Sequence, residues 1–192
     1  MQKKLVAVIA ATAGVLLGAG FHNLLPAATA ADPAPSWMAV ADRIAIEDLV
    51  VRYYAHLGGT SAESFGEYFT EDGMFEVNGD VYHGRKEIVA LYAGMGGGVT
   101  ADEKELLHMV LSNPVIEVNG DTAVASFLWT GIMNGTNTAP PRIREQGREY
   151  DRLVKRNGKW LIAKRVVIAD SGLPESMLDT WQRKLDYDIS RD

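Results

Sequence analysis

The chain contains four histidines and no cysteine, so an imidazole is its first candidate for proton transfer near neutral pH. His108 stands within the apolar segment Leu106-Leu107-His108-Met109-Val110. Burial among such residues would favour the neutral imidazole, which suits a general base. A core histidine that makes one hydrogen bond would have the same sequence context, so both interpretations stay open.

Other residues could complete a site around such a base. Asp151 and Arg152 are neighbours in a predicted strand. Because neighbouring strand residues point to opposite faces, at most one of the two faces an interior. That residue could supply a carboxylate or bind an anionic group, whereas two exposed charges would give the same sequence. Four aromatic residues could line an apolar pocket or simply fill the core: Phe75, Phe127, Trp129 and Tyr150.

The sequence offers no recognisable metal or cofactor site. Neither a His-x-His nor a His-x-x-x-His spacing occurs, and thiolate ligands are absent. The glycine-rich segment 94–98 follows a predicted helix and lacks the Lys-Ser/Thr ending of a phosphate-binding loop. We therefore expect a protein that works without a metal or a cofactor.

Helices are expected first along the chain. Apolar residues recur at spacings of three and four between Ile46 and Leu57, which predicts an amphipathic helix. Asp42 could cap this helix and Gly58-Gly59 would end it, while Tyr53 lies on its apolar face. Further helices are predicted over residues 61–69, 86–92 and 174–187.

Three of the four Asn-Gly dipeptides, Asn78-Gly79, Asn119-Gly120 and Asn157-Gly158, lie within the proposed hairpins between β-prone segments, which predicts three hairpins with type I′ turns. Helices followed by long hairpins, without alternation of strands and helices, indicate an α+β fold. A curved antiparallel sheet wrapped around the N-terminal helices would form a cone that is open at one end. The expected hairpins pair 74–77 with 81–83, 110–118 with 122–132, and 148–156 with 159–169.

The first thirty residues have the features of a signal peptide. Lys3 and Lys4 precede an uncharged, mostly apolar segment, and Ala28-Thr29-Ala30 suits cleavage after Ala30. Export to the periplasm or the medium is therefore expected. The alternative is an uncleaved membrane anchor, since the apolar segment extended to Leu25 is just long enough to span a bilayer. The expected organisation is a signal peptide over 1–30, a flexible leader over 31–40, one domain over 41–170 and a tail over 171–192.

The charge of the chain argues against nucleic acid as a partner. The net charge is −6, and removing Lys3 and Lys4 leaves 17 basic against 25 acidic residues, a net charge of −8. An acidic domain of this kind is poorly suited to nucleic acid or to an anionic membrane surface.

Several short motifs follow one another in a characteristic order. They are Arg52-Tyr53-Tyr54, Phe69-Thr70-Glu71-Asp72-Gly73, His83-Gly84-Arg85-Lys86-Glu87-Ile88, His108, the segment 112–121, Tyr150-Asp151-Arg152-Leu153 and Asn157-Gly158-Lys159-Trp160. In this order and spacing, residues 42–168 resemble the SnoaL-like branch of the nuclear transport factor 2-like superfamily.

The resemblance implies a cone-shaped domain with a site in its interior. In similar proteins a histidine at the position of His108 faces this interior as a general base, and a tyrosine at the position of Tyr53 polarises a substrate oxygen. Residues at the positions of Asp151 and Arg152 sometimes face the cavity as well. A catalytic aspartate usually follows the first helix, but Gly58 occupies that position here.

Three kinds of function are compatible with these features. The first is a cofactor-free lyase or isomerase in which His108 moves a proton on a small apolar molecule. The second is a non-catalytic domain of the cell envelope that binds a hydrophobic ligand, which Gly58 favours. The third is an interaction module. The resemblance also implies a homodimer formed through the sheet.

Overall fold

The computed structural model describes residues 36–57, 62–94, 106–135, 138–173 and 187–192, together with 175, 179 and 181. All of them belong to one compact unit, Pro35–Asp192. The expected signal peptide, Gly58 and most of the expected terminal helix lie outside the described residues.

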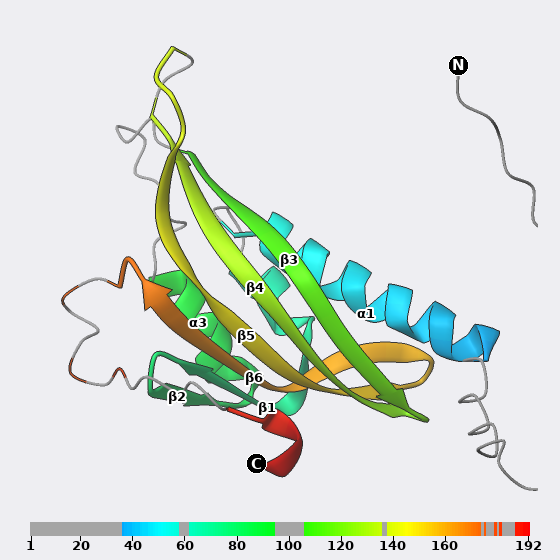
Figure 1. Ribbon diagram of the computed structural model, residues 1–192. Helices are drawn as coiled ribbons and strands as arrows, with labels where there is room; N and C mark the ends of the chain where they lie inside the picture. The colour runs from blue at the N-terminus through cyan, green and yellow to red at the C-terminus, as the bar shows by residue number, and fades with distance from the viewer. Residues whose placement is uncertain are drawn as a thin grey trace, which may run out of the picture. The chain divides into compact units, whose positions relative to one another are not determined.

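Six strands form one curved sheet in the order β2-β1-β6-β5-β4-β3. Neighbouring strands are antiparallel except for β1 and β6, which are parallel. Helix α1 lies along β3, and α3 lies beside β1 and β2 (Figure 1). The expected α+β class with a curved sheet around helices is confirmed, although the sheet does not close, because β2 and β3 form its edges. The elements are α1 (Trp37–Ala55), α2 (Glu63–Gly66), β1 (Phe69–Val77), β2 (Asp80–His83), α3 (Gly84–Gly94), β3 (Leu106–Asn119), β4 (Thr122–Asn134), β5 (Arg142–Arg156), β6 (Lys159–Ser171) and the 3₁₀ helix η3 (Ile189–Arg191).

Helix α1 begins earlier than the expected cap at Asp42. The Ser36 hydroxyl accepts a hydrogen bond from the Ala39 amide at 3.2 Å and caps the helix in its place. Asp42 instead accepts hydrogen bonds from Lys155 Nζ at 2.6 Å and from Trp160 Nε1 at 3.0 Å. This carboxylate therefore ties α1 to the hairpin of β5 and β6.

All three expected hairpins are present. In two of their turns both central residues have positive φ, as type I′ requires: Asn78 (52°) with Gly79 (98°), and Asn157 (52°) with Gly158 (77°). The third turn departs from this prediction, because only its glycine, Gly120, has a positive φ of 59°.

The two short helices differ in length from their predictions. Helix α2 ends at Gly66, because Phe69 already belongs to β1 and pairs with Ile162 of β6. Helix α3 is longer than predicted and begins directly after β2. Pairing between distant strands thus limits the local helical preference around Phe69.

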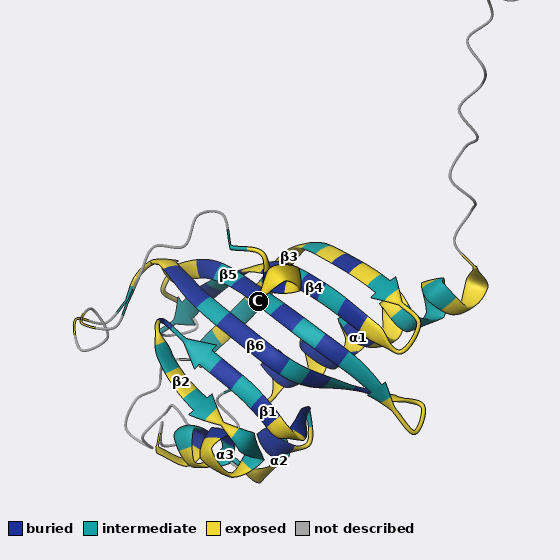
Figure 2. Ribbon diagram, turned by 90° about the horizontal axis from the view of Figure 1, so that it is seen from below, coloured by how far each residue is buried: buried dark blue, intermediate teal, exposed yellow. Residues whose placement is uncertain are grey.

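The sheet has a filled inner face and a partly covered outer face. The inner face packs against the helices through the main hydrophobic core. On the outer face, Val166 and Ile168 form a smaller cluster with Ile189 of η3, and Tyr150 and Tyr187 pack against it. Buried and less buried residues alternate along the strands, as Figure 2 shows. Within the described ranges, no helix combines the length and apolarity needed to cross a bilayer.

Candidate functional site

The inner face of β5 carries polar residues where a core would normally be apolar. Glu149 and Asp151 alternate with outward residues and both have a relative exposure of 0%. Gly147 precedes them on the same face and Leu153 follows. Two carboxyl groups of one strand therefore point toward the helices and away from solvent.

Arg165 of β6 is the cation of this inner cluster. Its Nε lies 2.7 Å from Asp151 Oδ1 and its Nη2 lies 2.9 Å from Asp151 Oδ2, so the pair forms two parallel hydrogen bonds. Nη2 is also 3.0 Å from Glu149 Oε1. All three side chains are fully buried. We name this group, together with Tyr53 and Tyr54, the inner cluster.

A bulge in β6 explains why Arg165 faces inward. Trp160 and Ile162 are buried on the inner face, and simple alternation would place Lys164 there next. The register shifts between the pairs Leu153–Ile162 and Arg152–Lys164, which inserts one residue into β6. Lys164 therefore turns outward, and its neighbour Arg165 takes the inner position.

Two tyrosines of α1 complete the inner cluster. The Tyr54 hydroxyl donates a hydrogen bond to Glu149 Oε2. The ring of Tyr53 lies against the guanidinium, with Arg165 Cζ 4.0 Å from the ring centroid. The Tyr53 hydroxyl contacts the hydroxyl of Tyr92 on α3. The predicted interior position of Tyr53 is thus what the structure shows, whereas its chemical role stays a prediction.

Burial decides the protonation of the inner cluster. It raises the pKa of Glu149 well above the usual value, and Arg165 offsets only part of this effect. Burial alone would lower the pKa of Arg165. The carboxyl groups of Asp151 and Glu149 raise this pKa by more than burial lowers it, so the guanidinium stays charged. Burial likewise raises the pKa of Tyr53 and Tyr54. The cluster therefore combines an Arg–Asp ion pair with a second buried carboxyl group, Glu149, whose pKa burial raises.

Three buried polar atoms of the inner face find no hydrogen-bond partner within the described part of the chain. They are Trp129 Nε1, Glu149 Oε1 and Arg165 Nη1. Trp129 of β4 pairs in the sheet with Gly147 of β5, and Arg165 of β6 pairs with Asp151 of β5. Glu149 lies between Gly147 and Asp151 on the inner face of β5. Trp129, Glu149 and Arg165 therefore form a row of inward residues across the three strands. Leaving such a group unpaired costs about 1–3 kcal/mol. Rows of this kind are typical of places where a ligand or water completes the bonding.

Gly147 makes room for the indole of Trp129. A Cβ atom at residue 147 would lie 2.3 Å from Trp129 Cζ2 and 2.2 Å from the carbonyl oxygen of Ile168. Any other residue would therefore displace both the indole and the β6 backbone. The glycine allows the ring to cross β5 at close range.

Three of the four predicted pocket aromatics lie on the inner face. Phe75, Phe127 and Trp129 have relative exposures of 3%, 3% and 5%. Phe75 pairs in the sheet with Arg165, so an aromatic ring lies directly beside the inner cluster. The inner face therefore combines apolar side chains with a few polar groups.

Tyr150 and Arg152 do not face the interior, in contrast to the prediction. They alternate with Glu149 and Asp151 and so point to the outer face. The ring of Tyr150 packs edge-on against Tyr187, with a centroid separation of 5.0 Å. Arg152 Nη2 donates to the carbonyl oxygen of Ile189 at 2.8 Å, next to its contact with Asp192. Both residues thus hold the C-terminal segment.

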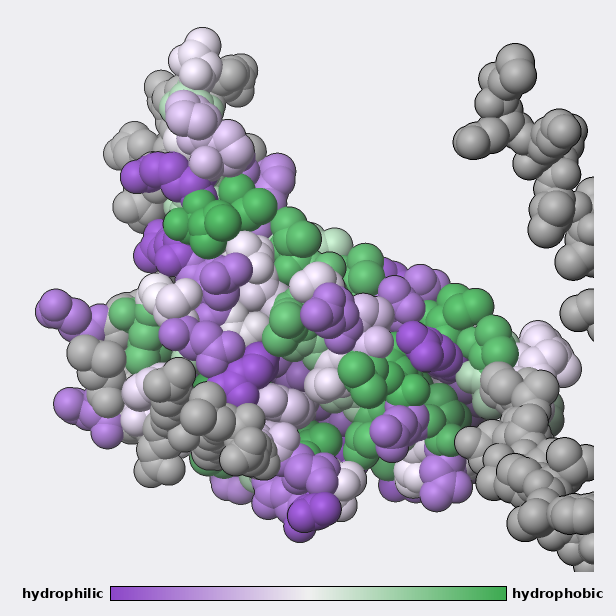
Figure 3. Space-filling view, in the orientation of Figure 1, coloured by the Kyte–Doolittle hydropathy of each residue, from purple (hydrophilic) through white to green (hydrophobic). Residues whose placement is uncertain are grey.

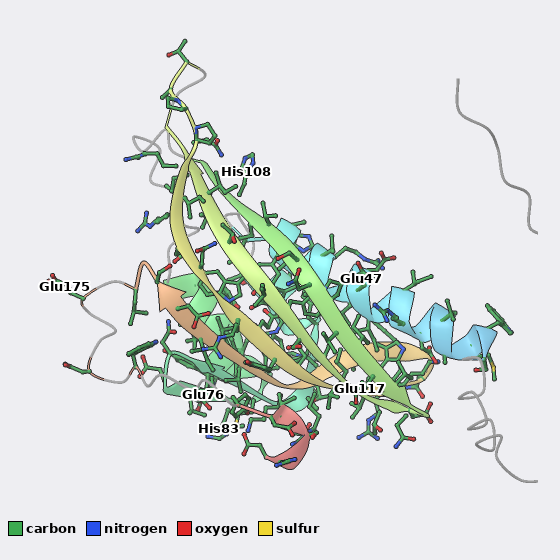
Figure 4. All side chains as sticks on the ribbon, viewed as in Figure 1. Glu47, Glu76, His83, His108, Glu117 and Glu175 are labelled. Carbon is green, nitrogen blue, oxygen red and sulfur yellow. The ribbon has the colours of Figure 1, made fainter. Side chains whose placement is uncertain are left out.

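His108 also lies outside the interior, so its expected buried position is wrong. Met109 and Leu111 pack against the core, and strand alternation turns the side chain of His108 outward, where it is exposed. Figure 4 shows His108 at the start of β3, far from His83 on the opposite side of the domain. In the described ranges, no three histidine, aspartate or glutamate side chains gather as a metal site would require.

Glu149 and Arg165 were not among the residues singled out from the sequence. The alternation of inward and outward residues along β5 indicates Glu149, because a residue two positions before an inward Asp151 must also face inward. No comparable signal exists for Arg165, since the bulge that turns it inward depends on pairing with β5.

Comparisons with known proteins agree with this architecture. Residues 38–166 match the family model of the SnoaL-like domain. A protein of unknown function from Mycobacterium tuberculosis is 27% identical over 68% of this chain and 73% of its own, with a TM-score of 0.54. A search among curated proteins found no match.

Two structures from Novosphingobium aromaticivorans are similar in fold. One is a nuclear transport factor 2-like protein with a cystatin-like fold, 22% identical over 72% of this chain and 90% of its own, with a TM-score of 0.58. The other is provisionally assigned as a scytalone dehydratase, 22% identical over 69% of this chain and 86% of its own, with a TM-score of 0.57. Since the family model covers most of the chain, the protein belongs to the SnoaL-like domain family of the nuclear transport factor 2-like superfamily.

Proposed function

We propose that this protein binds a small, largely apolar molecule at the inner cluster and moves a proton on it without a cofactor, as a lyase or isomerase. The observation that carries the proposal is the fully buried Glu149, whose Oε1 lies 3.0 Å from Arg165 Nη2 but forms no hydrogen bond of good geometry with the described residues. A buried carboxyl group with a raised pKa is a typical general acid or base.

Glu149 would exchange the proton with the substrate. Its raised pKa lets it hold a proton at pH values where an exposed glutamate has lost it. The protonated form can donate to a substrate oxygen, and the carboxylate that remains can accept a proton from an adjacent carbon. Tyr54 holds Oε2, so Oε1, which lies 3.0 Å from Arg165 Nη2, is the oxygen that would face the substrate.

Two unpaired donors would bind the substrate oxygen. Arg165 Nη1 and Trp129 Nε1 both carry hydrogens without partners among the described residues. Donors fixed in a buried site stabilise negative charge that develops on an oxygen during proton abstraction. The preferred ligand therefore carries a carbonyl or hydroxyl oxygen on an apolar frame.

Asp151 and Tyr53 support the site as positioning residues. Both oxygens of Asp151 are occupied by Arg165, so this carboxylate orients the guanidinium. Tyr53 supports the same guanidinium from the side of α1. The exposure of His108 supports Glu149 as the proton-transfer group of this proposal.

One similar structure carries a dehydratase name, and a dehydratase removes water by proton transfer. That name agrees with the reaction class proposed here. The reaction on this chain is argued from the inner cluster, because at 22% identity the likeness concerns the fold.

A test uses 2-tetralone, a small and mostly apolar ketone with acidic hydrogens beside its carbonyl. In deuterated water, NMR would follow deuterium incorporation with the wild type, Glu149→Gln and His108→Ala. We expect the wild type to accelerate exchange, Glu149→Gln to lose about 10²-fold or more of that acceleration, and His108→Ala to retain it. Loss in His108→Ala with retention in Glu149→Gln would contradict the assignment.

Binding without catalysis is the second candidate. It is favoured by the absence of an imidazole from the inner cluster, since none of the described histidines lies in it. In this case tryptophan fluorescence would show saturable binding of 2-tetralone, no exchange above background in any variant, and unchanged ketone after recovery.

We also propose that the protein is exported and that residues 1–30 are removed. The support is the sequence pattern of a basic start, an apolar segment and Ala28-Thr29-Ala30. Mass spectrometry of the protein from its own host tests this. The mature mass should begin at Ala31, and an intact N-terminus in a membrane fraction would favour the anchor instead.

A further inference from the structure

A third carboxyl group, that of Glu145, lies on the inner face of β5. Glu145 stands four residues before Glu149, so strand alternation turns both side chains inward. Four residues of a strand span about 13 Å, which is the separation of the two backbones. Glu145 is half-buried, whereas Glu149 is fully buried. The inner face therefore carries one acid in the core and a second acid close to solvent.

A bulge makes Glu145 the last inward residue of β5. The register with β4 shifts next to the pair Gly131–Glu145, which leaves Arg144 as an extra residue directly before Glu145. Ile143, on the other side of the bulge, is 67% exposed. The inward row of β5 thus ends in a carboxyl group.

Glu145 lies at the end of the sheet where β3 begins and β4 ends. Gly131, its partner in β4, pairs in turn with Met109 of β3, next to His108. Figure 4 labels His108 at this end of the sheet. Apolar and hydrophilic side chains lie next to one another on the surface there (Figure 3). Because exposure falls along the inner row from Glu145 to Glu149, Glu145 stands between solvent and the inner cluster.

Gly131 gives the carboxyl group of Glu145 room on the neighbouring strand. A Cβ atom at residue 131 would lie 2.7 Å from Glu145 Cγ and 3.0 Å from Glu145 Oε1. The same position lies 3.3 Å from Leu107 Cδ1. Trp129 stands two residues before Gly131 and faces inward beside it. The carboxyl group therefore lies over the glycine, with Leu107 and Trp129 as its apolar neighbours on this face.

The chain that follows β6 holds the backbone of Glu145 in place. Gly172 has a φ of 79°, a conformation that favours glycine. A Cβ atom at residue 172 would lie 2.2 Å from the carbonyl oxygen of Arg144 and 2.7 Å from Glu145 Cα. This close packing on the bulge restricts the direction in which Glu145 points.

The carboxyl group of Glu145 makes no hydrogen bond or ion pair within the ranges that the structure describes. Burial raises its pKa, and the charge of Arg144 offsets this effect only in part. The group has therefore lost part of its hydration without gaining a partner. By contrast, Asp170 on the outer face pairs with Arg148 at 2.7 Å. The free carboxyl group is suited to a hydrogen bond from a ligand.

We propose that Glu145 binds the far end of the ligand, and that the ligand carries a hydroxyl group there in addition to the oxygen at the inner cluster. This role rests on the proposed function, since the inner cluster positions the first oxygen. Arg165 and Trp129 offer hydrogens to that oxygen, whereas Glu145 offers an acceptor to the hydroxyl group. A frame of two fused rings, with a hydrogen bond of about 2.8 Å at each end, spans the distance between Glu145 and Glu149.

A hydroxyl group suits this position better than a charged group. It donates to the carboxylate and can also accept from the protonated acid, so it fits either state of Glu145. The carboxylate would repel an anionic group, and an ammonium group would lose hydration beside Leu107 and Trp129. A site that accepts a hydrogen bond from its ligand also rejects analogues without the donor. The ligand class is thus a hydroxylated ketone on an apolar frame.

Equilibrium dialysis of 6-hydroxy-2-tetralone and 6-methoxy-2-tetralone tests this role on the full-length chain. The methyl group of the second ketone replaces the hydrogen that the first can donate. We expect the wild type to bind the hydroxy ketone about tenfold more tightly than the methoxy ketone. Glu145→Leu should reduce this ratio to about one or below, because leucine accepts no hydrogen bond. Glu145→Gln, whose amide oxygen still accepts, should keep a ratio of about three.

Gly131→Ala disturbs the same contact and leaves the carboxyl group in the chain. Its Cβ would displace the side chain of Glu145 without a clash against the backbone, so the ratio should fall below about three. Glu117→Gln is the matched control, because Glu117 is exposed on β3 and its neighbour Ile116 takes the inner position. This variant should keep the ratio of the wild type. Circular dichroism would confirm that every variant is folded.

Deuterium exchange of the same ketones separates this role from the proposed function. Glu149→Gln should lose the exchange and keep the binding ratio. A ratio that responds to Glu145→Leu, without exchange above background in the wild type, would remove the proton-transfer role and support Glu145 as a binding residue. Accelerated exchange with the same ratio in the wild type and Glu145→Leu would overturn the role of Glu145 alone. Absence of binding by both ketones would overturn both roles.

Discussion

The two faces of β5 place similar residues in opposite environments. On the inner face, Asp151 and Glu149 are fully buried and share Arg165. On the outer face, Arg148 forms an ion pair with Asp170 at 2.7 Å, in which the side chains are 14% and 42% exposed. Neighbouring residues of the strand point to opposite faces. One face thus holds a buried charge cluster, and the other holds an ion pair in contact with water.

The comparison shows that position in the sheet decides what a charge can do. The outer pair is screened by solvent and contributes little to stability. The inner pair has lost its hydration, so each charge depends on its partner, and burial raises the pKa of the neighbouring Glu149. Only the inner face therefore offers groups suited to proton transfer.

Removing the inner cation should have the largest effect. Arg165→Met leaves Asp151 and Glu149 buried without their cation, and we expect a loss of about 3–5 kcal/mol in the free energy of unfolding. Arg148→Met on the outer face should lose less than about 1 kcal/mol. Urea unfolding followed by circular dichroism measures both. Equal losses would show that the two faces do not differ in this way.

A change of shape on the inner face should come next. Gly147→Ala forces its Cβ to within 2.2 Å of a backbone oxygen, so β5 and β6 must separate. We expect a loss of about 1–3 kcal/mol and an altered emission of Trp129. Gly94→Ala is the control, because a Cβ there meets no atom within 4 Å. An undisturbed Gly147→Ala protein would contradict the close packing of the indole.

Glu149 should make the stability depend on pH. Because its folded pKa is raised, the folded state binds more protons than the unfolded state above about pH 4.3, the usual pKa of glutamate. Its contribution is therefore complete below that pH and declines as the pH rises, by at most about 1.4 kcal/mol per pH unit. Glu149→Gln should remove this slope. The free energies of unfolding of the wild type and of Glu149→Gln are compared between pH 4 and pH 8. If both change with pH in the same way, Glu149 ionises as an exposed glutamate does.

The smallest effect is expected on the outer face. Asp170→Asn keeps the shape of the side chain and removes one charge from the pair with Arg148. We expect a change below about 1 kcal/mol that disappears at high salt. Thermal unfolding at low and high ionic strength measures it. A loss of stability as large as that of Arg165→Met would show that the outer pair also stabilises the fold.

Local patterns in the sequence determined the elements of this protein. The spacing of Ile46, Leu49 and Tyr53 indicated α1, and three Asn-Gly turns indicated the hairpins, because both signals depend on neighbours along the chain. Strand alternation also limited Asp151 and Arg152 to one inward residue. The class of fold and the interior position of Tyr53 follow from the same local rules.

Only the tertiary structure decided which polar groups meet. His108 turns outward because Met109 takes the inner position on its strand, and nothing in its own apolar neighbourhood indicates that choice. Arg165 turns inward because of a bulge that exists only when β6 pairs with β5. A shift by one residue exchanges the two faces of a strand, so the identity of the charged residues at the site depends on register, which the sequence pattern alone leaves open.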